Sequence, residues 1–233
     1  MNWCLMSSNF GLFADTASAG SYVLETPRKV PGLADLHRMV TLLVAERAPA
    51  DAHVLVVGAG GGLEIRAMAE ARPDWRFTGV DPSSAMLDVA RQTTSACAER
   101  TQFILGRAID APPGPFDAAV CLLTLHFLDR DERLETLQEI GRRLRPGGTL
   151  VAAHHTAVGG EAEAWLRRSA AFAGGASADT EKAAASARVM AGQLPLLSPE
   201  GEEDLFRDAG FLHPALFYAA FSFRGWVMTR PGS

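Results

Sequence analysis

A dense glycine turn lies between an apolar run and a possible helix start, in "VLVVGAGGGLEIR" (residues 54–66). Such a turn lets the backbone lie close against a ligand, because glycine has no side chain to keep the ligand away. The dinucleotide-binding pattern requires a further glycine where this chain has Leu63. The phosphate-binding loop requires a Gly-Lys-Ser/Thr ending, which this turn lacks. The turn alone therefore indicates a nucleotide-like ligand without identifying it.

An acidic residue ends the next apolar run of the chain. Asp81 stands 23 residues after Gly58, where a carboxylate can accept hydrogen bonds from both hydroxyls of an adenosine ribose. This position fits NAD and S-adenosylmethionine (SAM) equally. The chain lacks the Tyr-x-x-x-Lys pair of the commonest short-chain dehydrogenases, and SAM has no pyrophosphate that must be cradled. These two observations favour SAM.

Histidines follow two of the later apolar runs, where the acceptor of a transferred group would approach. His126 could take a proton from an acceptor, and its alternative role is that of a polar residue lining the cleft. His154 and His155 are adjacent at the end of a predicted strand, so alternation points their side chains to opposite faces. Only one of them can face the cleft and they cannot share an ion, so we expect no metal site.

Three further residues have reactive or charged side chains. Glu64 follows the glycine turn, where a carboxylate favours the helix dipole; it could also hold the ammonium group of SAM, and both interpretations stay open. Cys121 lies inside an apolar run and is expected in the core. Arg107 is expected on the surface.

The elements that must position these residues alternate in type. Apolar runs predict strands at residues 53–58, 76–81, 101–106, 116–123 and 149–155, and helical patterns cover residues 33–48, 63–71, 83–99 and 131–144. Strands that alternate with helices indicate an α/β fold with a parallel sheet covered on both faces. Near the C-terminus, "LHPALFYAAFSFRGWVMTR" contains two strands with no helix between them. Such neighbours must be antiparallel.

The two ends of this pattern carry additional segments. Residues 1–32 are predicted to be irregular because glycine and proline interrupt them; their aromatic residues Trp3, Phe10 and Tyr22 could fold over the cleft as a lid or pack on the sheet. Helices are also predicted at residues 161–173, at residues 178–191 and from Ser198-Pro199 onward. We therefore expect one domain, residues 1–233, with an N-terminal lid and helix (1–48) and a helical cover (160–197).

Length and composition are those of one ordinary globular domain. Hydrophobic residues make up 48% and charged residues 21% of 233, and the net charge is −5. This charge provides no overall field for a nucleic acid. The three cysteines are scattered along the chain and are odd in number, which argues against a disulfide framework. The N-terminus lacks a signal-peptide pattern and the longest apolar run is too short for a membrane span. We expect a cytoplasmic protein without membrane or nucleic-acid partners.

Five segments between residues 54 and 148 resemble class I SAM-dependent methyltransferases. They are "VLVVGAGGG", "VDPSSAML", "GRAIDAP", "FDAAVCLLTLHFL" and "LRPGG", in that family's order and spacing. The resemblance implies a seven-stranded, mostly parallel Rossmann-like sheet with a C-terminal antiparallel hairpin, and SAM as cofactor. It implies that the methionine end of SAM lies on Gly58, Ala59 and Gly60, the ribose on Asp81 and Pro82, and the adenine on Asp110 and Ala111.

A narrower resemblance, from about residue 28 onward, is to the carboxy-SAM synthases, which make carboxy-SAM from SAM and prephenate. It is carried by "RKVPGLADLHRMVTLL", "LLTLHFLDRDERLETLQEIGRRLRPGGTL" and "DLFRDAGFLHPALFYAAFSFRGWV". Arg188 falls near the arginine with which that subfamily holds a carboxylate in a neighbouring subunit's site, which implies a homodimer. Three positions depart from the pattern: Leu33 replaces a tyrosine, Leu122 replaces an asparagine in the cofactor cleft, and Val56 replaces an acid common in methyltransferases. The cleft is therefore more apolar, which favours a different acceptor.

The sequence predicts a SAM-dependent methyltransferase that acts on a small-molecule acceptor. Methyl transfer from a sulfonium needs alignment of acceptor, methyl carbon and sulfur more than acid–base catalysis, so no catalytic dyad is required. His126 and Arg188 are the candidate catalytic residues. Two alternatives remain: a carboxy-SAM synthase, and a SAM-binding protein without catalysis.

Overall fold

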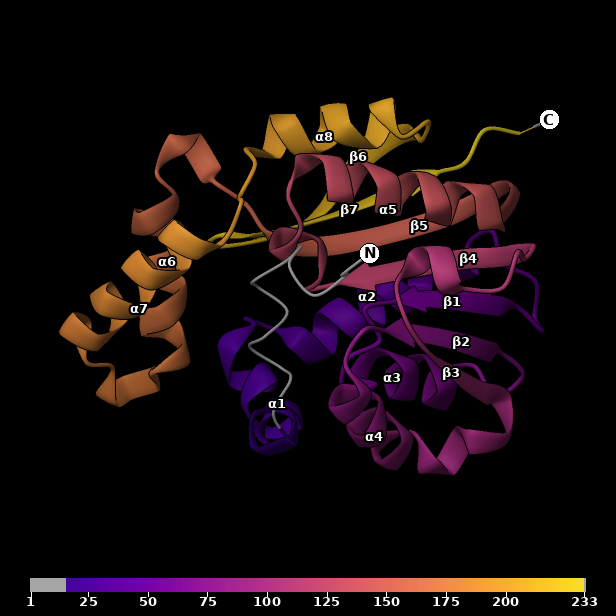
Figure 1. Ribbon diagram of the computed structural model, residues 1–233, viewed down its shortest axis with the longest axis horizontal. Coiled ribbons are helices and arrows are strands. Elements are labelled where there is room, and N and C mark those ends of the chain that lie inside the picture. The colour runs from indigo at the N-terminus through magenta and orange to yellow at the C-terminus, as the bar shows by residue number, and fades with distance from the viewer. Residues whose placement is uncertain (1–15, 233) are drawn as a thin grey trace, which may run out of the picture.

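The structure is a computed structural model that describes the backbone of residues 16–232 and the side chains of residues 20–232. Seven strands form one sheet in the order β3-β2-β1-β4-β5-β7-β6 (Figure 1). In chain order they are β1 (His53–Val57), β2 (Arg76–Asp81), β3 (Thr101–Leu105), β4 (Phe116–Leu122), β5 (Leu144–His155), β6 (Leu212–Ala220) and β7 (Phe223–Thr229). The first five are parallel neighbours, and β7 is antiparallel to both β5 and β6. The predicted fold class is confirmed.

Helices connect these strands close to the predicted positions. They are α1 (Thr16–Lys29), α2 (Leu33–Ala45), α3 (Leu63–Ala71), α4 (Ser84–Thr93), α5 (Arg130–Arg143), α6 (Ala162–Ala173), α7 (Thr180–Gln193) and α8 (Pro199–Asp208). The Ser83 and Ser198 hydroxyls accept hydrogen bonds from the Met86 and Gly201 amides and so cap α4 and α8. The predicted helix at residues 83–99 is too long, because Cys97 has non-helical backbone angles and α4 gives way to a 3-10 segment, Ser95–Arg100.

The prediction that residues 1–32 are irregular is wrong for Thr16–Lys29, which form α1. Gly20 and Pro27 stand inside this helix, although both residue types weaken helices in isolation. Tertiary packing outweighs that preference, since α1 contacts α4, α6 and α2. The helix therefore depends on its neighbours, which local sequence cannot show.

The central strands β1 and β4 are buried on both faces, which explains their nearly continuous apolar sequences. In β1, Val54 and Val56 pack in a core with residues of α2 and α3. Leu55 and Val57 alternate to the other face and pack with residues of α5 and α8. Cys121, with 0% exposure, belongs to this second core as predicted. The two layers of helices hold the ends of the parallel strands rigidly, and these ends carry the site.

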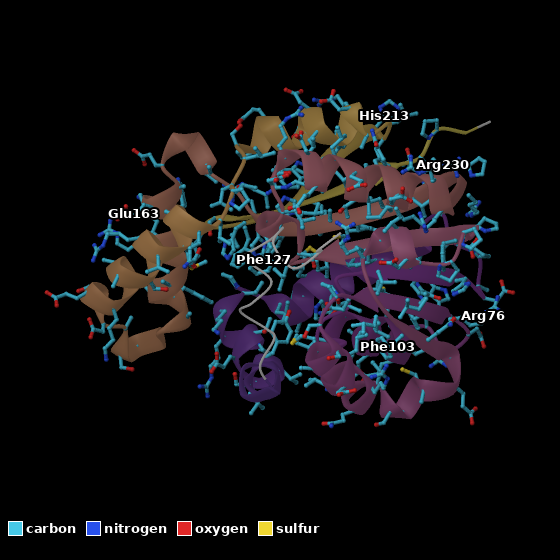
Figure 2. The ribbon with its side chains drawn as sticks, in the orientation of Figure 1. Arg76, Phe103, Phe127, Glu163, His213 and Arg230 are labelled. Atoms are coloured by element: carbon cyan, nitrogen blue, oxygen red, sulfur yellow. The ribbon has the colours of Figure 1, made fainter. Side chains whose placement is uncertain are left out.

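Helices α6 and α7 pack on one another beyond the sheet, and α6 also contacts α1 (Figure 1). They lie within the segment predicted as a helical cover. Figure 2 shows Phe127 near the middle of the molecule and Glu163 at the periphery, on α6. Within residues 16–232, no helix combines the length and apolar character needed to cross a bilayer.

Candidate active site

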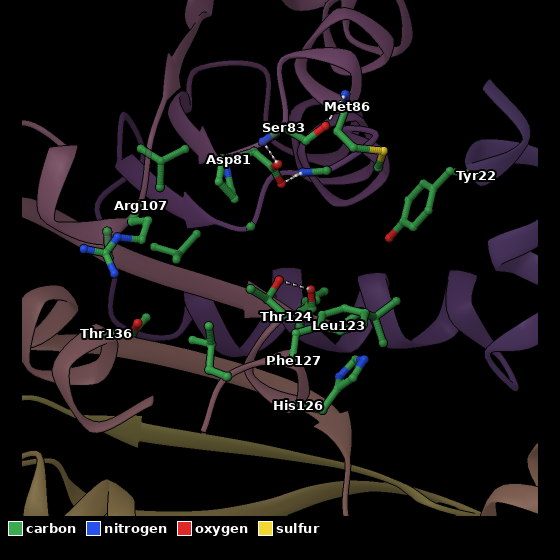
Figure 3. Close-up of a pocket in the computed structure, with 18 of the residues that line it drawn as sticks. Tyr22, Asp81, Ser83, Met86, Arg107, Leu123, Thr124, His126, Phe127 and Thr136 are labelled. Atoms are coloured by element: carbon green, nitrogen blue, oxygen red, sulfur yellow. Dashed lines mark hydrogen bonds between the residues drawn. The ribbon is translucent and has the colours of Figure 1, made fainter. Parts of the chain in front are cut away.

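A cavity of about 520 Å³ opens at the carboxyl ends of β1, β2, β4 and β5, the edge at which open α/β sheets bind ligands. Asp81, Ser83 and Met86 lie along one wall in Figure 3. Thr124, His126 and Phe127 lie along the opposite wall. Of the predicted site residues, the cavity is lined by Gly58, Gly60, Asp81, Pro82, Leu122 and His126.

The glycine turn after β1 has backbone angles that side chains tolerate poorly. Gly58 and Gly60 have φ values of 71° and 46°. A Cβ at Gly58 would lie 2.0 Å from the Thr124 Oγ1 atom. The turn is held against β2, because the Gly58 and Ala59 amides donate to the Val80 carbonyl at 2.9 and 3.0 Å. Glycine here brings bare backbone to the cavity, as the sequence predicts.

Asp81 ends β2 and joins two segments of the cavity wall. Its Oδ2 atom accepts from the Gly60 amide and its Oδ1 atom from the Ser83 amide, both at 2.9 Å. Burial raises the pKa of the carboxyl, while the two amides act in the opposite direction. Each carboxylate oxygen keeps a further acceptor position, so ribose hydroxyls fit this group. The bare turn beside an anchored acid is a suitable cradle for a nucleoside such as that of SAM.

The predicted adenine contacts lie outside the cavity lining. Asp110 is exposed and its Oδ2 atom accepts from the Arg107 amide at 2.8 Å. Ala111 is buried, and its carbonyl accepts from Arg143 Nε at 3.1 Å. Arg107, which is half-exposed, and Ala108 line the cavity instead. The adenine contact of Asp110 and Ala111 stays a prediction.

Two histidines mark the end of the cavity away from Asp81. The His126 and His155 rings are 5.0 Å apart and nearly perpendicular, and both line the cavity. Burial and the neighbouring histidines lower the pKa of His126 well below its usual value, and burial and His154 lower the pKa of His155 to about 3. Both rings are therefore neutral at pH 7. A neutral His126 can accept a proton or a hydrogen bond.

His154 points to the other face of the sheet, as strand alternation predicts. Its Nε2 atom lies 3.0 Å from a Glu202 carboxylate oxygen, and all of Glu202, His154 and Arg133 are fully buried. Arg133 pairs with Glu202 and also donates to the Leu128 carbonyl at 3.1 Å. This buried cluster fixes β5 to α5 and α8. Residues 20–232 contain no group of three His, Cys, Asp or Glu side chains that could hold a metal.

Helix α1 supplies one end of the cavity, which the sequence prediction largely missed. Tyr22, Thr26 and Lys29 of α1 and Val30, directly after it, line the cavity, and Tyr22 lies against the backbone of Gly61. The predicted lid aromatic Tyr22 is thus at the cavity, while Trp3 and Phe10 lie outside the described residues. In the sequence, the aromatic side chain of Tyr22 was the signal that could place this segment at the cavity.

The cover segment reaches the site only indirectly. None of the described residues 160–197 lines the cavity. Arg188 is exposed on α7 and does not line the cavity. Leu33, which replaces the subfamily's tyrosine, is buried in the core with 5% exposure and does not line the cavity. The catalytic role of Arg188 stays a prediction.

Glu64, in the first turn of α3, is buried with 8% exposure. Burial, with a contribution from Asp81, raises its pKa to about 8. A carboxyl whose pKa is higher in the folded than in the unfolded state stabilises the fold fully below about pH 4.5 and loses that contribution as the pH rises to 8. We expect the wild-type free energy of unfolding to fall in this window, at a limiting slope of about 1.4 kcal/mol per pH unit.

Urea unfolding of Glu64→Gln from pH 5 to 8 tests this expectation, because glutamine does not titrate and the slope should flatten. Glu70→Gln is the control, since Glu70 lies on the same helix but its side chain is 73% exposed. Equal slopes in wild type and Glu64→Gln would mean that Glu64 titrates normally.

Known proteins match this chain in sequence and in fold. Residues 54–148 match the family of methyltransferase domains. The chain is 31% identical over 124 residues to the carboxy-S-adenosyl-L-methionine synthase of Campylobacter lari, covering 53% of each protein. It is 30% identical over 142 residues to the ribosomal RNA small subunit methyltransferase G of a Nocardioides strain, covering 60% of this chain and 57% of that protein. The chain thus spans about half the length of the curated relatives it matches.

A solved structure shares nearly the whole fold. The O-methyltransferase family protein from Burkholderia thailandensis superposes with a TM-score of 0.67 at 16% identity, over 97% of this chain and 63% of that one. At this identity the superposition establishes the architecture. The chain therefore has the class I SAM-dependent methyltransferase fold, and its residues 54–148 are similar in sequence to methyltransferase domains.

Proposed function

We propose that the protein is an enzyme that transfers the methyl group of SAM to a small, uncharged acceptor. The observation that carries the proposal is that the glycine turn, Asp81 and His126 all line one cavity. The turn and the acid suit a nucleoside, and the histidine end leaves room for a second molecule. The methyltransferase domain family and the relatives with SAM-related names support this cofactor.

SAM, when bound, supplies an electrophilic methyl group on a sulfonium. Asp81 would orient the ribose, and the bare backbone at Gly58 would let the amino acid portion lie close to β1. Leu122 and Phe127 line the same cavity and keep water from the reacting atoms, which suits a reaction in which charge is lost at sulfur. His126 would hold the acceptor and accept its proton. Rate enhancement then comes mainly from alignment.

The cavity supports an uncharged acceptor. Its histidine end is formed by neutral rings and by the apolar side chains of Leu122, Phe127 and Phe223. Lys29 lines the cavity on α1 but is paired with Glu25 at 2.5 Å and its side chain is 60% exposed. The net charge of −5 disfavours an RNA acceptor, despite the RNA-modifying relative.

Ligand binding gives the most direct test. SAM and S-adenosylhomocysteine (SAH) should raise the melting temperature, and NAD should not, because the turn lacks the third glycine of the dinucleotide-binding pattern. A ligand at one hundred times its Kd adds about 2.7 kcal/mol of stability. Differential scanning fluorimetry with the three compounds measures this. An equal shift with NAD would contradict the cofactor assignment.

A second candidate function is carboxy-SAM synthesis, favoured by the 31% identity to the Campylobacter lari synthase. We propose that in this case the protein is a dimer and Arg188 holds a carboxylate in the neighbouring subunit. Mass spectrometry after incubation with SAM and prephenate would detect the product, and light scattering would detect the dimer. Arg188→Ala should then leave SAM affinity unchanged and abolish the reaction, whereas Arg167→Ala, another arginine of the cover, should retain it.

A further inference from the structure

A chain of three buried side chains runs from the cover helix α6 to the cavity. Ser222 lies in the turn between β6 and β7, and its Oγ atom is 2.7 Å from His155 Nδ1 and 2.7 Å from Ser169 Oγ. Ser222, Ser169 and His155 have exposures of 0%, 5% and 8%. Since water does not reach these groups freely, every hydroxyl proton in the chain needs a protein acceptor.

The direction of these hydrogen bonds can be deduced by counting donors and acceptors. Within the described part of the chain, the Ser169 hydroxyl hydrogen-bonds only with Ser222: it accepts from the Ser222 amide at 3.4 Å and its Oγ atom lies 2.7 Å from Ser222 Oγ. The Ser169 proton therefore has one available acceptor, the Ser222 Oγ atom. The Ser222 proton is then directed to His155 Nδ1. In the reverse direction the Ser169 proton would be buried without a partner.

This direction of the hydrogen bonds fixes the tautomer of His155. If Nδ1 accepts from Ser222, the single proton of the neutral ring is on Nε2. The ring plane is also fixed, because His155 stacks on Phe223 with centroids 3.9 Å apart and an interplanar angle of 28°. The His126 ring is in edge-to-face contact with it, with centroids 5.0 Å apart. His155 lines the cavity, so Nε2 is the ring nitrogen left for a ligand.

We propose that His155 is a specificity residue that donates a hydrogen bond from Nε2 to an oxygen of the methyl acceptor, and that Ser222 and Ser169 are positioning residues that fix its tautomer. The proposal rests on the proposed function, because it assumes that the acceptor occupies the histidine end. The acceptor then carries an uncharged oxygen with a free lone pair, such as a carbonyl, next to a flat portion that packs on Phe223 and Phe127. His155 does not remove a proton; that role stays with His126.

The tautomer can be measured without cofactor or acceptor. Long-range ¹H–¹⁵N NMR of ¹⁵N-histidine-labelled full-length protein at pH 7 distinguishes a protonated from an unprotonated ring nitrogen, and His155→Gln identifies the His155 signals. We expect Nε2 protonated and Nδ1 unprotonated in more than nine-tenths of the molecules. Ser222→Ala removes the donor to Nδ1 and should shift the ring to a mixture of tautomers. Ser186→Ala, at an exposed serine of α7, should change nothing.

Recognition of an acceptor oxygen is tested with a probe of that chemistry. In the presence of saturating SAH, acetophenone should move the His155 Nε2 signals in wild type, and this shift should be lost in Ser222→Ala but kept in Ser186→Ala. A proton found on Nδ1 in the wild type, an unchanged tautomer in Ser222→Ala, or no response of His155 to acetophenone up to its solubility would each overturn the proposal. Failure of SAH to bind would instead count against the proposed function, since the tautomer measurement does not depend on it.

Discussion

Gly58→Ala should destabilise the fold by about 3 kcal/mol and abolish SAM binding. A left-handed backbone costs a residue with a Cβ about 1–2 kcal/mol, and overpacking adds about 1–3 kcal/mol. Gly58 has a φ of 71°, and its Cβ would lie 2.0 Å from Oγ1 and 2.7 Å from Cβ of Thr124. Rotation of the Thr124 side chain cannot relieve the contact with its own Cβ. The turn or the loop after β4 must therefore move, which deforms the cavity.

Gly147→Ala separates the cost of the left-handed backbone from the cost of overpacking. Gly147 has a φ of 72°, and a Cβ there would meet no atom within 4 Å. This variant should lose only about 1 kcal/mol and keep SAM affinity. For a domain of this size each kcal/mol lowers the melting temperature by roughly 2–4 °C, so the two variants should differ clearly in thermal unfolding. Equal losses would show that the close contact at Thr124 is absent in solution.

Asp81→Ala should weaken SAM binding by at least about 100-fold. Two hydrogen bonds to the ribose are lost, and a hydrogen bond to a charged group contributes about 1.5–3 kcal/mol; each 1.4 kcal/mol is a factor of ten. The substitution also removes the acceptors of the Gly60 and Ser83 amides, so the turn is less ordered before the ligand arrives. Both effects weaken SAM binding.

Calorimetric titration with SAH measures the effect of Asp81→Ala. Asp88→Ala is the matched control, because Asp88 is an exposed acid on the adjacent helix α4 with its own partner Arg91 at 2.7 Å. It should bind SAH as the wild type does. Unchanged affinity in Asp81→Ala would place the ribose elsewhere in the cavity.

The parts of the site that could be predicted from sequence are local in the chain. Helix α3 has the predicted bounds, since the glycine turn, the helix and the apolar spacing that follows are contiguous. The turn and Asp81 likewise follow each other through one strand–helix–strand unit, whose geometry is restricted by right-handed crossover. Their place at the carboxyl edge of the sheet therefore follows from the pattern alone.

The parts that could not be predicted depend on contacts between distant segments. His155 and Ser222 are 67 residues apart, and Ser169 and Ser222 are 53 apart. Only the return of β7 beside β5 brings them together, with Phe223 directly opposite His155 in the ladder. Helix α1 was missed for a similar reason, because its stability comes from packing rather than from its own residues.

The position of β7 between β5 and β6 determines when the active site becomes complete during protein synthesis. The β6–β7 hairpin follows all other described elements in the chain, yet β7 occupies an interior place in the sheet. A growing polypeptide contains the glycine turn and Asp81 once β2 has been made. Strand β5 then exposes an unpaired edge, and the wall containing Phe223 is missing, until the ribosome has added the hairpin. Nascent chains would thus acquire the cofactor end of the cavity well before the acceptor end, and the exposed edge of β5 is a point at which incomplete chains would aggregate.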